Sequence, residues 1–280
     1  GRGNDYGDWL NGDNLILDGW PREGADTPRE VFATAFFAYS TELVAKMACV
    51  LGREDKARQY ADLADQIESS FVKHFVESNG RIRGDTQTIY ALALHFDLVP
   101  ESMRSTMLKH LLREIEEYNG SLSTGIQGTN RMMLTLANEK QLDLAYDLLM
   151  KRSVPSWGYM IDQVATTIWE RWDGYVEGRG FQNPGMNSFN HYAFGAIGEW
   201  IYRDIAGINP DPSSPGYKHI ILKPRPGGEL KFARGQLETL FGTIESSWRI
   251  QLGKLNYSCT VPSNTSATLH LPTSNPDSLD

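Results

Sequence analysis

The sequence predicts a mainly α-helical domain, forming part of a toroid of helical hairpins, followed by a small antiparallel β domain. Two observations carry this prediction. Before Gly207, apolar residues recur at helical spacing in segments separated by short breaks, which is typical of paired helices. After Gly207 come short β-rich runs separated by turns that contain glycine or proline. We therefore place one domain at residues 1–208 and a second at residues 209–280.

Composition sets limits on the classes of partner. The 280 residues, with 40% hydrophobic and 22% charged side chains, are ordinary for a soluble globular protein. The net charge of −8 argues against nucleic acid, which binds basic patches. No membrane partner is expected either, since no apolar run is long enough to span a bilayer. Six scattered histidines lack metal-ligand spacing, so no metal or other cofactor is predicted. Composition leaves the compartment open.

Helix start and stop signals can be recognised in the part of the sequence before Gly207. Thr27 is expected to cap a helix that begins at Pro28, with Glu30 completing a capping box and Gly52 ending the helix. A second helix, at about residues 53–76, forms an antiparallel hairpin with the first. No fixed-length repeat appears, which disfavours a solenoid. Further helices are expected at residues 85–96, capped by Asp85, and at residues 100–118, 129–138, 141–152 and 187–206.

The β domain follows a linker at residues 209–216, which reads NPDPSSPG. Arg225, in the string PRPGG, is expected to have a structural role. Two cysteines form no disulfide framework, so Cys49 and Cys259 are expected to be buried free thiols. The expected strands lie at residues 219–222, 230–237, 242–251, 254–261 and 267–271.

One stretch, residues 166–174, concentrates groups suited to sugar chemistry. It reads TTIWERWDG and places Glu170 between Trp169 and Trp172. Tryptophan faces stack on sugar rings, and a carboxylate beside such a platform can take a proton from water. The alternative is a core tryptophan beside an ion pair between Glu170 and Arg171. The stretch ends in Asp-Gly, a turn signal, so it is expected to leave its element at a loop.

Two other segments share this polar and aromatic character. Residues 183–192 read NPGMNSFNHY and are expected to open a helix near His191. Residues 1–26 read as a loop that contains the Asp8-Trp9 pair among several aspartates and glycines. Loops of this composition often line sites, although buried tryptophans that pin a loop to the helices are an equal alternative.

These strings resemble the bacterial α-L-rhamnosidases of glycoside hydrolase family 78. TTIWERWDG followed by FQNPGMNSFNHYAFGAIGEW carries the resemblance, and it covers nearly the whole chain in the expected order. The family implies an (α/α)6 six-hairpin toroid, partial in this chain, and a β-sandwich-like C-terminal domain. It also implies hydrolysis of terminal α-L-rhamnose with inversion, on a rhamnose-containing glycoside or polysaccharide. The other matching strings are YGDWL, TPRE, GDTQT, STG and PRPGG.

The resemblance also assigns roles to residues. Glu170 matches the family's catalytic glutamate and is the candidate general base. His191 matches a histidine that contacts the sugar, although a lone histidine is more often a structural hydrogen-bonding group. Asp8 and Trp9 resemble the family's segment at the sugar pocket. Trp169 and Trp172 are candidate sugar or wall residues, and two of the three tryptophans are equally compatible with a core position.

One departure from the family pattern concerns the general acid. The family's acid-rich motif lies upstream of the Gly7-Asp8-Trp9 segment, and nothing in these residues corresponds to it. We therefore expect the C-terminal portion of an enzyme, inactive on its own, with uncovered apolar helix faces that drive self-association. Two alternatives stay open, a different (α/α)6 carbohydrate enzyme and a non-catalytic helical interaction module.

Overall fold

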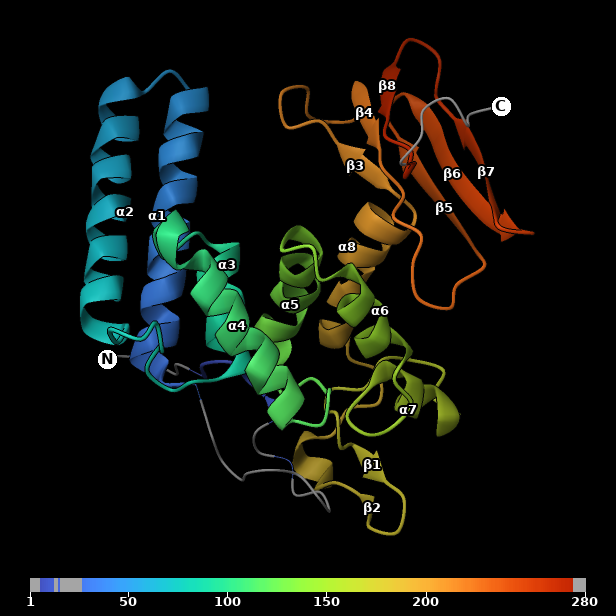
Figure 1. Cartoon of the computed structure of the whole chain (residues 1–280). Helices are drawn as coiled ribbons and strands as arrows, with labels where there is room; N and C mark the ends of the chain where they lie inside the picture. Colours follow the sequence, from blue (N-terminus) through green and yellow to red (C-terminus); the bar gives the residue numbers. More distant parts are fainter. Residues whose placement is uncertain (1–5, 13–14, 16–26, 274–280) are drawn as a thin grey trace. The chain divides into compact units, whose positions relative to one another are not determined.

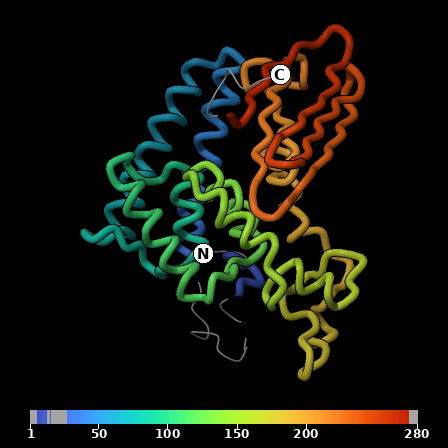
Figure 2. The backbone as a smooth tube through the Cα atoms, turned by 45° about the vertical axis from the view of Figure 1, so that its right-hand side comes forward, coloured from blue at the N-terminus to red at the C-terminus, as the bar shows by residue number. Residues whose placement is uncertain are grey.

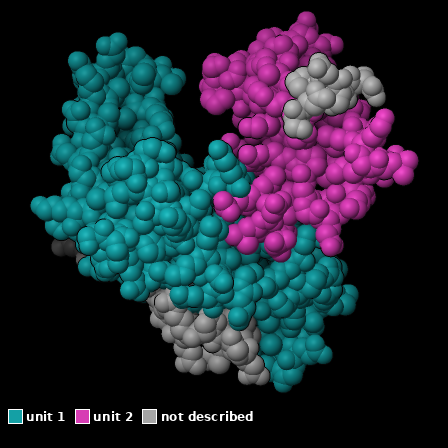
Figure 3. Space-filling model, in the orientation of Figure 1, with its two compact units in different colours: residues 1–140, 148–195 teal, residues 141–147, 196–280 magenta. Residues whose placement is uncertain are grey.

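The computed structural model describes residues 6–12, 15 and 27–273 (Figure 1). Contacts within the chain group into two compact units, which Figure 3 colours separately. The first unit comprises residues 1–140 and 148–195, and the second comprises residues 141–147 and 196–280. Helical hairpins followed by a β-rich end confirm the predicted fold class. The single domain boundary predicted after residue 208 stays a prediction.

The first unit is built from helices that pair along the chain. α1 (Arg29–Val50) and α2 (Glu54–Phe75) form a hairpin, joined through Gly52, whose φ of 65° suits glycine. α3 is buried along nearly its whole length, because its own side chains are mostly small or apolar on every face. It packs against both α4 and α5. The remaining helices are α3 (Gln87–His95), α4 (Glu101–Glu117), α5 (Ile126–Asn138), α6 (Leu142–Met150), which spans both units, and α7 (Trp157–Asp162).

The predicted cap of α1 is wrong. Pro28 occupies the N-cap position, and no side chain caps the helix. Thr27 is buried instead, and its hydroxyl lies 2.6 Å from the hydroxyl of Thr86. Glu30 does not complete a capping box either, because its carboxylate pairs with Arg83 at 2.7 Å. A tertiary contact has replaced the local one in both cases.

The predicted cap of α3 is also wrong, by one residue. Thr86 caps the helix by accepting a hydrogen bond from the Ile89 amide at 3.4 Å. Asp85 has a φ of 48° and turns away to accept hydrogen bonds from Tyr90 and Arg113. The guanidinium of Arg113 lies 2.5 Å from its Oδ1. Because these partners hold the ionised form, they lower the pKa of Asp85 against the effect of its burial.

A stripe of exposed residues runs along α1 at alternating spacings of three and four. This spacing places them on one face of a helix. The face is apolar apart from one serine, and its Phe37 and Met47 side chains are 53% and 56% exposed. Such contiguous apolar surface is typical of an interaction site. We call it the α1 stripe: Ala33, Phe37, Ser40, Val44, Met47 and Leu51.

We expect residues 1–280, expressed alone, to self-associate through the α1 stripe. Replacing both Phe37 and Met47 with lysine should shift the protein to the monomer, because it places charges in the apolar contact. Sedimentation velocity measures the distribution. Leu240→Lys is the control, since Leu240 is an even more exposed apolar residue that lies in a turn of the second unit, outside the α1 stripe. A wild-type protein that stays monomeric at high concentration contradicts the prediction.

The second unit contains two three-stranded sheets. One has the order β3–β4–β8 and the other the order β5–β6–β7. Neighbouring strands are antiparallel, as predicted, except that β4 and β8 run parallel. β3 lies partly within the predicted linker. The strands are β3 (Ile208–Pro210), β4 (His219–Leu222), β5 (Phe232–Thr239), β6 (Gly242–Gln251), β7 (Lys254–Thr260) and β8 (Ser266–Leu269).

The core of the second unit lies between these sheets and the helical segment before them. Four fully buried aliphatic side chains form its centre, Ile208, Ile220, Leu222 and Ile244. The indole of Trp248, on β6, donates to the carbonyl of Ile205 at 2.7 Å. Ser246 on the same strand donates to the carbonyl of Ala206 at 2.5 Å. Alternate residues of β6 thus bind the end of the helical segment.

The predicted helix at 187–206 begins later than expected. Residues 187–192 are irregular, and the helical segment consists of a 3₁₀ helix (Ala193–Ile197), α8 (Gly198–Trp200) and a π-helical turn (Ile201–Ile205). Both cysteines are exposed rather than buried. Cys49 lies in the last turn of α1, in an open groove beside α2, and Cys259 lies on edge strand β7. Among the helices described, none is long and apolar enough to cross a membrane.

Candidate active site

Two short segments of the first unit run beside each other and hold the candidate base. The Glu170 amide donates to the Ser188 carbonyl at 2.9 Å, and the His191 amide donates to the Ile168 carbonyl at 2.9 Å. These backbone hydrogen bonds explain why residues 187–192 are not helical, since the Ser188 carbonyl and the His191 amide pair with another segment. They also bring Glu170 and His191, two of the predicted site residues, onto adjacent segments.

The Glu170 carboxylate accepts a single hydrogen bond from the described residues. Its Oε2 accepts a hydrogen bond from the Ser188 amide at 2.8 Å, and within the described residues no other group hydrogen-bonds or pairs with this carboxylate. The alternative of a Glu170–Arg171 ion pair is wrong, because Arg171 Nε donates to Asp173 Oδ1 at 3.1 Å. The half-buried side chain of Glu170 therefore keeps an oxygen free to accept a proton from water.

Asp173 fixes the turn that follows Glu170. Its carboxylate is buried and accepts hydrogen bonds from Arg171, from Arg179 at 2.9 Å and from Gln182 at 2.5 Å. Arg179 lies in the turn of the hairpin of β1 (Tyr175–Val176) and β2 (Gly180–Phe181), and Gln182 directly follows β2; this hairpin extends away from the helices (Figure 2). Charge-assisted hydrogen bonds to a buried carboxylate are strong, so Asp173 anchors the hairpin to the segment that carries Glu170.

His191 is half-buried, with one ring nitrogen engaged. Its Nδ1 lies 3.3 Å from the Ala193 amide, which donates to it. Because Nδ1 accepts, this tautomer places the ring proton on Nε2, which makes Nε2 a donor. Among the described residues, no partner is recorded for Nε2. His191 therefore keeps one donor available for a ligand next to the segment of Glu170.

Trp169 and Trp172 are core residues in this structure. Only 1% of Trp172 is exposed, and its ring stacks on Phe194 at 4.0 Å between centroids. Its Nε1 donates to the Thr124 carbonyl at 2.9 Å. Trp169 is 4% exposed and meets Phe189 edge to face at 5.1 Å. Neither indole presents an open face for a sugar to stack on, so their sugar-binding role stays an untested prediction that burial disfavours.

Asp8 is engaged by the start of α5 rather than open to solvent. Its carboxylate accepts hydrogen bonds from the Thr88 hydroxyl and from the amides of Gly125, Gln127 and Gly128 at 2.7 to 2.9 Å. A helix N-terminus attracts a carboxylate in this way. Burial raises the pKa of Asp8, and the four donors oppose that rise. The saturated carboxylate indicates a structural role for Asp8, and its predicted sugar contact stays untested.

Glycine is required where the Asp8 loop meets α5. A Cβ at Gly125 would lie 2.4 Å from the Trp9 carbonyl oxygen, and one at Gly128 would lie 2.5 Å from the Thr88 hydroxyl. Trp9 itself is 37% exposed and meets Tyr6 edge to face at 4.9 Å. Of the three predicted tryptophans, Trp9 alone offers an accessible indole.

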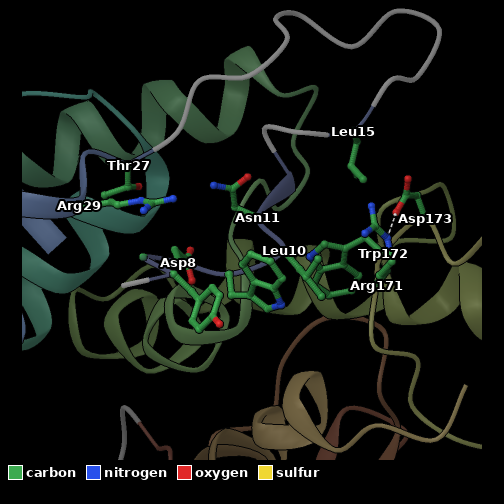
Figure 4. Close-up of a pocket in the computed structure, with 12 residues that line it drawn as sticks. Asp8, Leu10, Asn11, Leu15, Thr27, Arg29, Arg171, Trp172 and Asp173 are labelled. Carbon is green, nitrogen blue, oxygen red and sulfur yellow. Dashed lines mark hydrogen bonds and ion pairs between the residues drawn. The ribbon is translucent and has the colours of Figure 1, made fainter. Parts of the chain in front are cut away.

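A cavity of about 240 Å³ opens between the Asp8 loop, the start of α1 and the residues just after Glu170 (Figure 4). It gathers predicted site residues Asp8, Trp9 and Trp172, while Glu170 and His191 are not among its lining residues. Arg29 and Arg171 also line it. Arg29 belongs to the matching string TPRE, but no functional role was predicted for it, because a lone arginine in the first turn of a helix carries no functional signal.

Helical hairpins followed by a β domain are the architecture expected of one class of protein, the six-hairpin glycosidases. Residues 1–205 match the family model described as the bacterial alpha-L-rhamnosidase 6 hairpin glycosidase domain. Residues 207–279 match the bacterial alpha-L-rhamnosidase C-terminal domain. The chain belongs to the bacterial α-L-rhamnosidase family, as the motifs predict. Membership favours a glycosidase over the alternative of a non-catalytic helical interaction module.

Named relatives agree with this assignment. An α-L-rhamnosidase of Streptomyces avermitilis is 43% identical over 97% of this chain and 25% of its own length. One from Formosa agariphila is 41% identical over 99% of this chain and 29% of its own length. The chain thus spans about a quarter of the length of these relatives.

Solved structures show the same fold. The Streptomyces avermitilis α-L-rhamnosidase complexed with L-rhamnose superposes with a TM-score of 0.88 at 43% identity, over 98% of this chain and 25% of that one. The native enzyme from Aspergillus terreus has a TM-score of 0.86 at 33% identity, over 95% of this chain and 31% of that one.

Proposed function

We propose that these residues belong to an enzyme that hydrolyses terminal α-L-rhamnosides with inversion, and that Glu170 is the general base. The carrying observation is the Glu170 carboxylate, which is held by one amide and otherwise unclaimed among the described residues. In this reaction a water oxygen bonds to the anomeric carbon while its proton passes to Glu170. The glycosidic C–O bond breaks, and the departing oxygen receives a proton from a general acid.

His191 supports this role by offering its Nε2 donor to a sugar hydroxyl beside the base. The family pattern puts the general acid upstream of the Gly7-Asp8-Trp9 segment. In our proposal residues 1–280 supply the base and part of the pocket, and rhamnose-containing glycosides are the substrates. The L-rhamnose bound to the Streptomyces avermitilis relative supports this substrate class.

The test of this proposal is the anomer that appears first. The full-length protein is mixed with an aryl α-L-rhamnoside, and proton NMR follows the released sugar before it mutarotates. Inversion predicts β-L-rhamnose as the first product, because water attacks the face opposite the aglycone. Release of α-L-rhamnose first contradicts the base role, since retention requires a nucleophile instead. Absence of hydrolysis, with other aryl glycosides cleaved, contradicts the substrate.

The matched comparison uses residues 1–280 alone. We expect their turnover to fall by about 10²- to 10⁴-fold relative to the full-length protein, the usual contribution of a general acid. Turnover within tenfold of the full-length protein would place the acid inside these residues, with Asp8 and Asp173 as the candidates. To act as the acid, Asp8 would have to lose hydrogen bonds that it accepts from backbone amides at the start of α5.

A further inference from the structure

The cavity of Figure 4 presents hydrogen-bond donors that nothing in the described chain uses. Arg29 lines it, and within the described residues its guanidinium makes no hydrogen bond or ion pair. Arg171 lines it from the segment after Glu170, and only its Nε is engaged, by Asp173. Figure 4 shows the two arginines on opposite sides of the cavity with Asn11 between them. The two guanidinium groups together leave several N–H donors in one small space.

The carboxylates that line the same cavity already accept hydrogen bonds from protein groups. Asp8 receives four hydrogen bonds from Thr88 and the start of α5. Asp173 receives three, two of them from arginines. Glu30, the acid next to Arg29 in the sequence, pairs with Arg83 at 2.7 Å. The cavity walls therefore combine unused donors with fully used carboxylates, which is an arrangement that selects acceptor-rich ligands.

We propose that this cavity is an anion subsite, which binds a carboxylate or sulfate ester on the glycan that carries the rhamnose. Arginine is the side chain best suited to such groups, because its planar fork of donors matches their oxygens. A volume of about 240 Å³ is below the usual range of drug-sized ligand pockets, so it fits a single sugar unit. Trp9 and Tyr6 add aromatic surface for that ring.

The chemistry argues against a neutral sugar as the preferred occupant. Each sugar hydroxyl both donates and accepts, so a neutral ring needs free acceptors as well as donors. The two carboxylates that line the cavity have their oxygens engaged, which leaves few acceptors for hydroxyl protons. An acidic sugar instead offers two or three oxygens that only accept. The inference rests on the proposed function for the identity of the glycan as a rhamnoside, and on the cavity alone for the anion.

Binding to the full-length protein carrying Glu170→Gln tests the proposal without turnover. Isothermal titration compares methyl β-D-glucuronide and methyl β-D-glucoside 6-sulfate with neutral methyl β-D-glucoside. We expect at least one anionic glycoside to bind roughly tenfold or more tightly than the neutral one, since charge-assisted hydrogen bonds exceed neutral ones. The glucuronide arm identifies a carboxylate as the ligand, and the sulfate arm a sulfate ester. Equal binding of all three glycosides overturns the proposal.

Variants of Arg29 test whether the preference for anionic glycosides arises in this cavity. Arg29→Gln should remove most of the preference for the anion, and Arg29→Lys should restore part of it by returning the charge. Arg58→Gln is the matched control, because Arg58 is an exposed arginine on α2 outside this cavity. Arg29→Gln that leaves the anionic preference intact, or weakens neutral and anionic glycosides equally, overturns the proposal. Anion binding by a protein that cleaves no rhamnoside would leave the subsite standing and refute the proposed function.

Discussion

Glu170→Gln is expected to lower kcat for an aryl α-L-rhamnoside by about 10²- to 10⁴-fold in the full-length protein. The amide keeps the size of the side chain and can still accept the hydrogen bond that the Ser188 amide gives at 2.8 Å. What it loses is the ability to take a proton from the attacking water. Because the neighbouring Arg171 pairs with Asp173, removing the Glu170 charge leaves no partner uncompensated. The loss should therefore appear in kcat, with little change in KM.

Two controls sharpen this result. Glu177→Gln makes the same change on an exposed residue of the neighbouring hairpin and should leave kcat unaltered. Azide should restore turnover to Glu170→Gln, because this nucleophile needs no deprotonation, and the product should be the β-L-rhamnosyl azide. Near wild-type turnover in a folded Glu170→Gln protein would exclude Glu170 as the base. Rescue that yields the α azide would contradict inversion.

Sequence patterns correctly predicted the helices and strands that are determined by interactions between residues close together in the chain. The runs at 53–76 and 100–118 gave helices close to α2 and α4, and the run at 242–251 coincides with β6. Periodicity and breakers suffice there, because one face of each element is buried and its neighbours are close in the chain. The motif TTIWERWDG likewise led to a carboxylate that proves to be unclaimed among the described residues.

Sequence patterns failed where a residue far away in the chain forms the hydrogen bond that a nearby residue was expected to form. Thr27 and Asp85 have the chemistry of helix caps, yet Thr86 and Arg113 claim their oxygens. Residues 187–192 look like a helix start, but their backbone pairs with the Glu170 segment. No pattern of spacing marks such pairings, because they join residues whose separation in sequence has no preferred value. Arg29 was missed for the same reason, since its significance comes from a cavity formed by three separate segments.

Trp172→Ala is expected to reduce the free energy of unfolding of the helical unit by about 3–5 kcal/mol, the usual cost of truncating a large buried aromatic residue. The indole stacks on Phe194, meets Trp157 edge to face at 5.2 Å, and donates to the Thr124 carbonyl at 2.9 Å. Its removal leaves a void and takes away the shorter of two hydrogen bonds to the Thr124 carbonyl, which then keeps only the one from the Thr129 hydroxyl at 3.5 Å. Urea unfolding followed by circular dichroism measures the change.

Trp172→Phe separates the two contributions, because it keeps a ring against Phe194 and loses the hydrogen bond to Thr124. We expect it to cost about 0.5–1.5 kcal/mol, the usual net contribution of one hydrogen bond, because the Thr129 hydroxyl still donates to this carbonyl at 3.5 Å. Trp9→Ala is the comparison for a partly exposed indole and should change stability much less. The two roles proposed for Trp172 then diverge in a measurable way. A platform for sugar predicts a raised KM at unchanged stability, whereas the buried stack predicts lost stability, with KM preserved in Trp172→Phe.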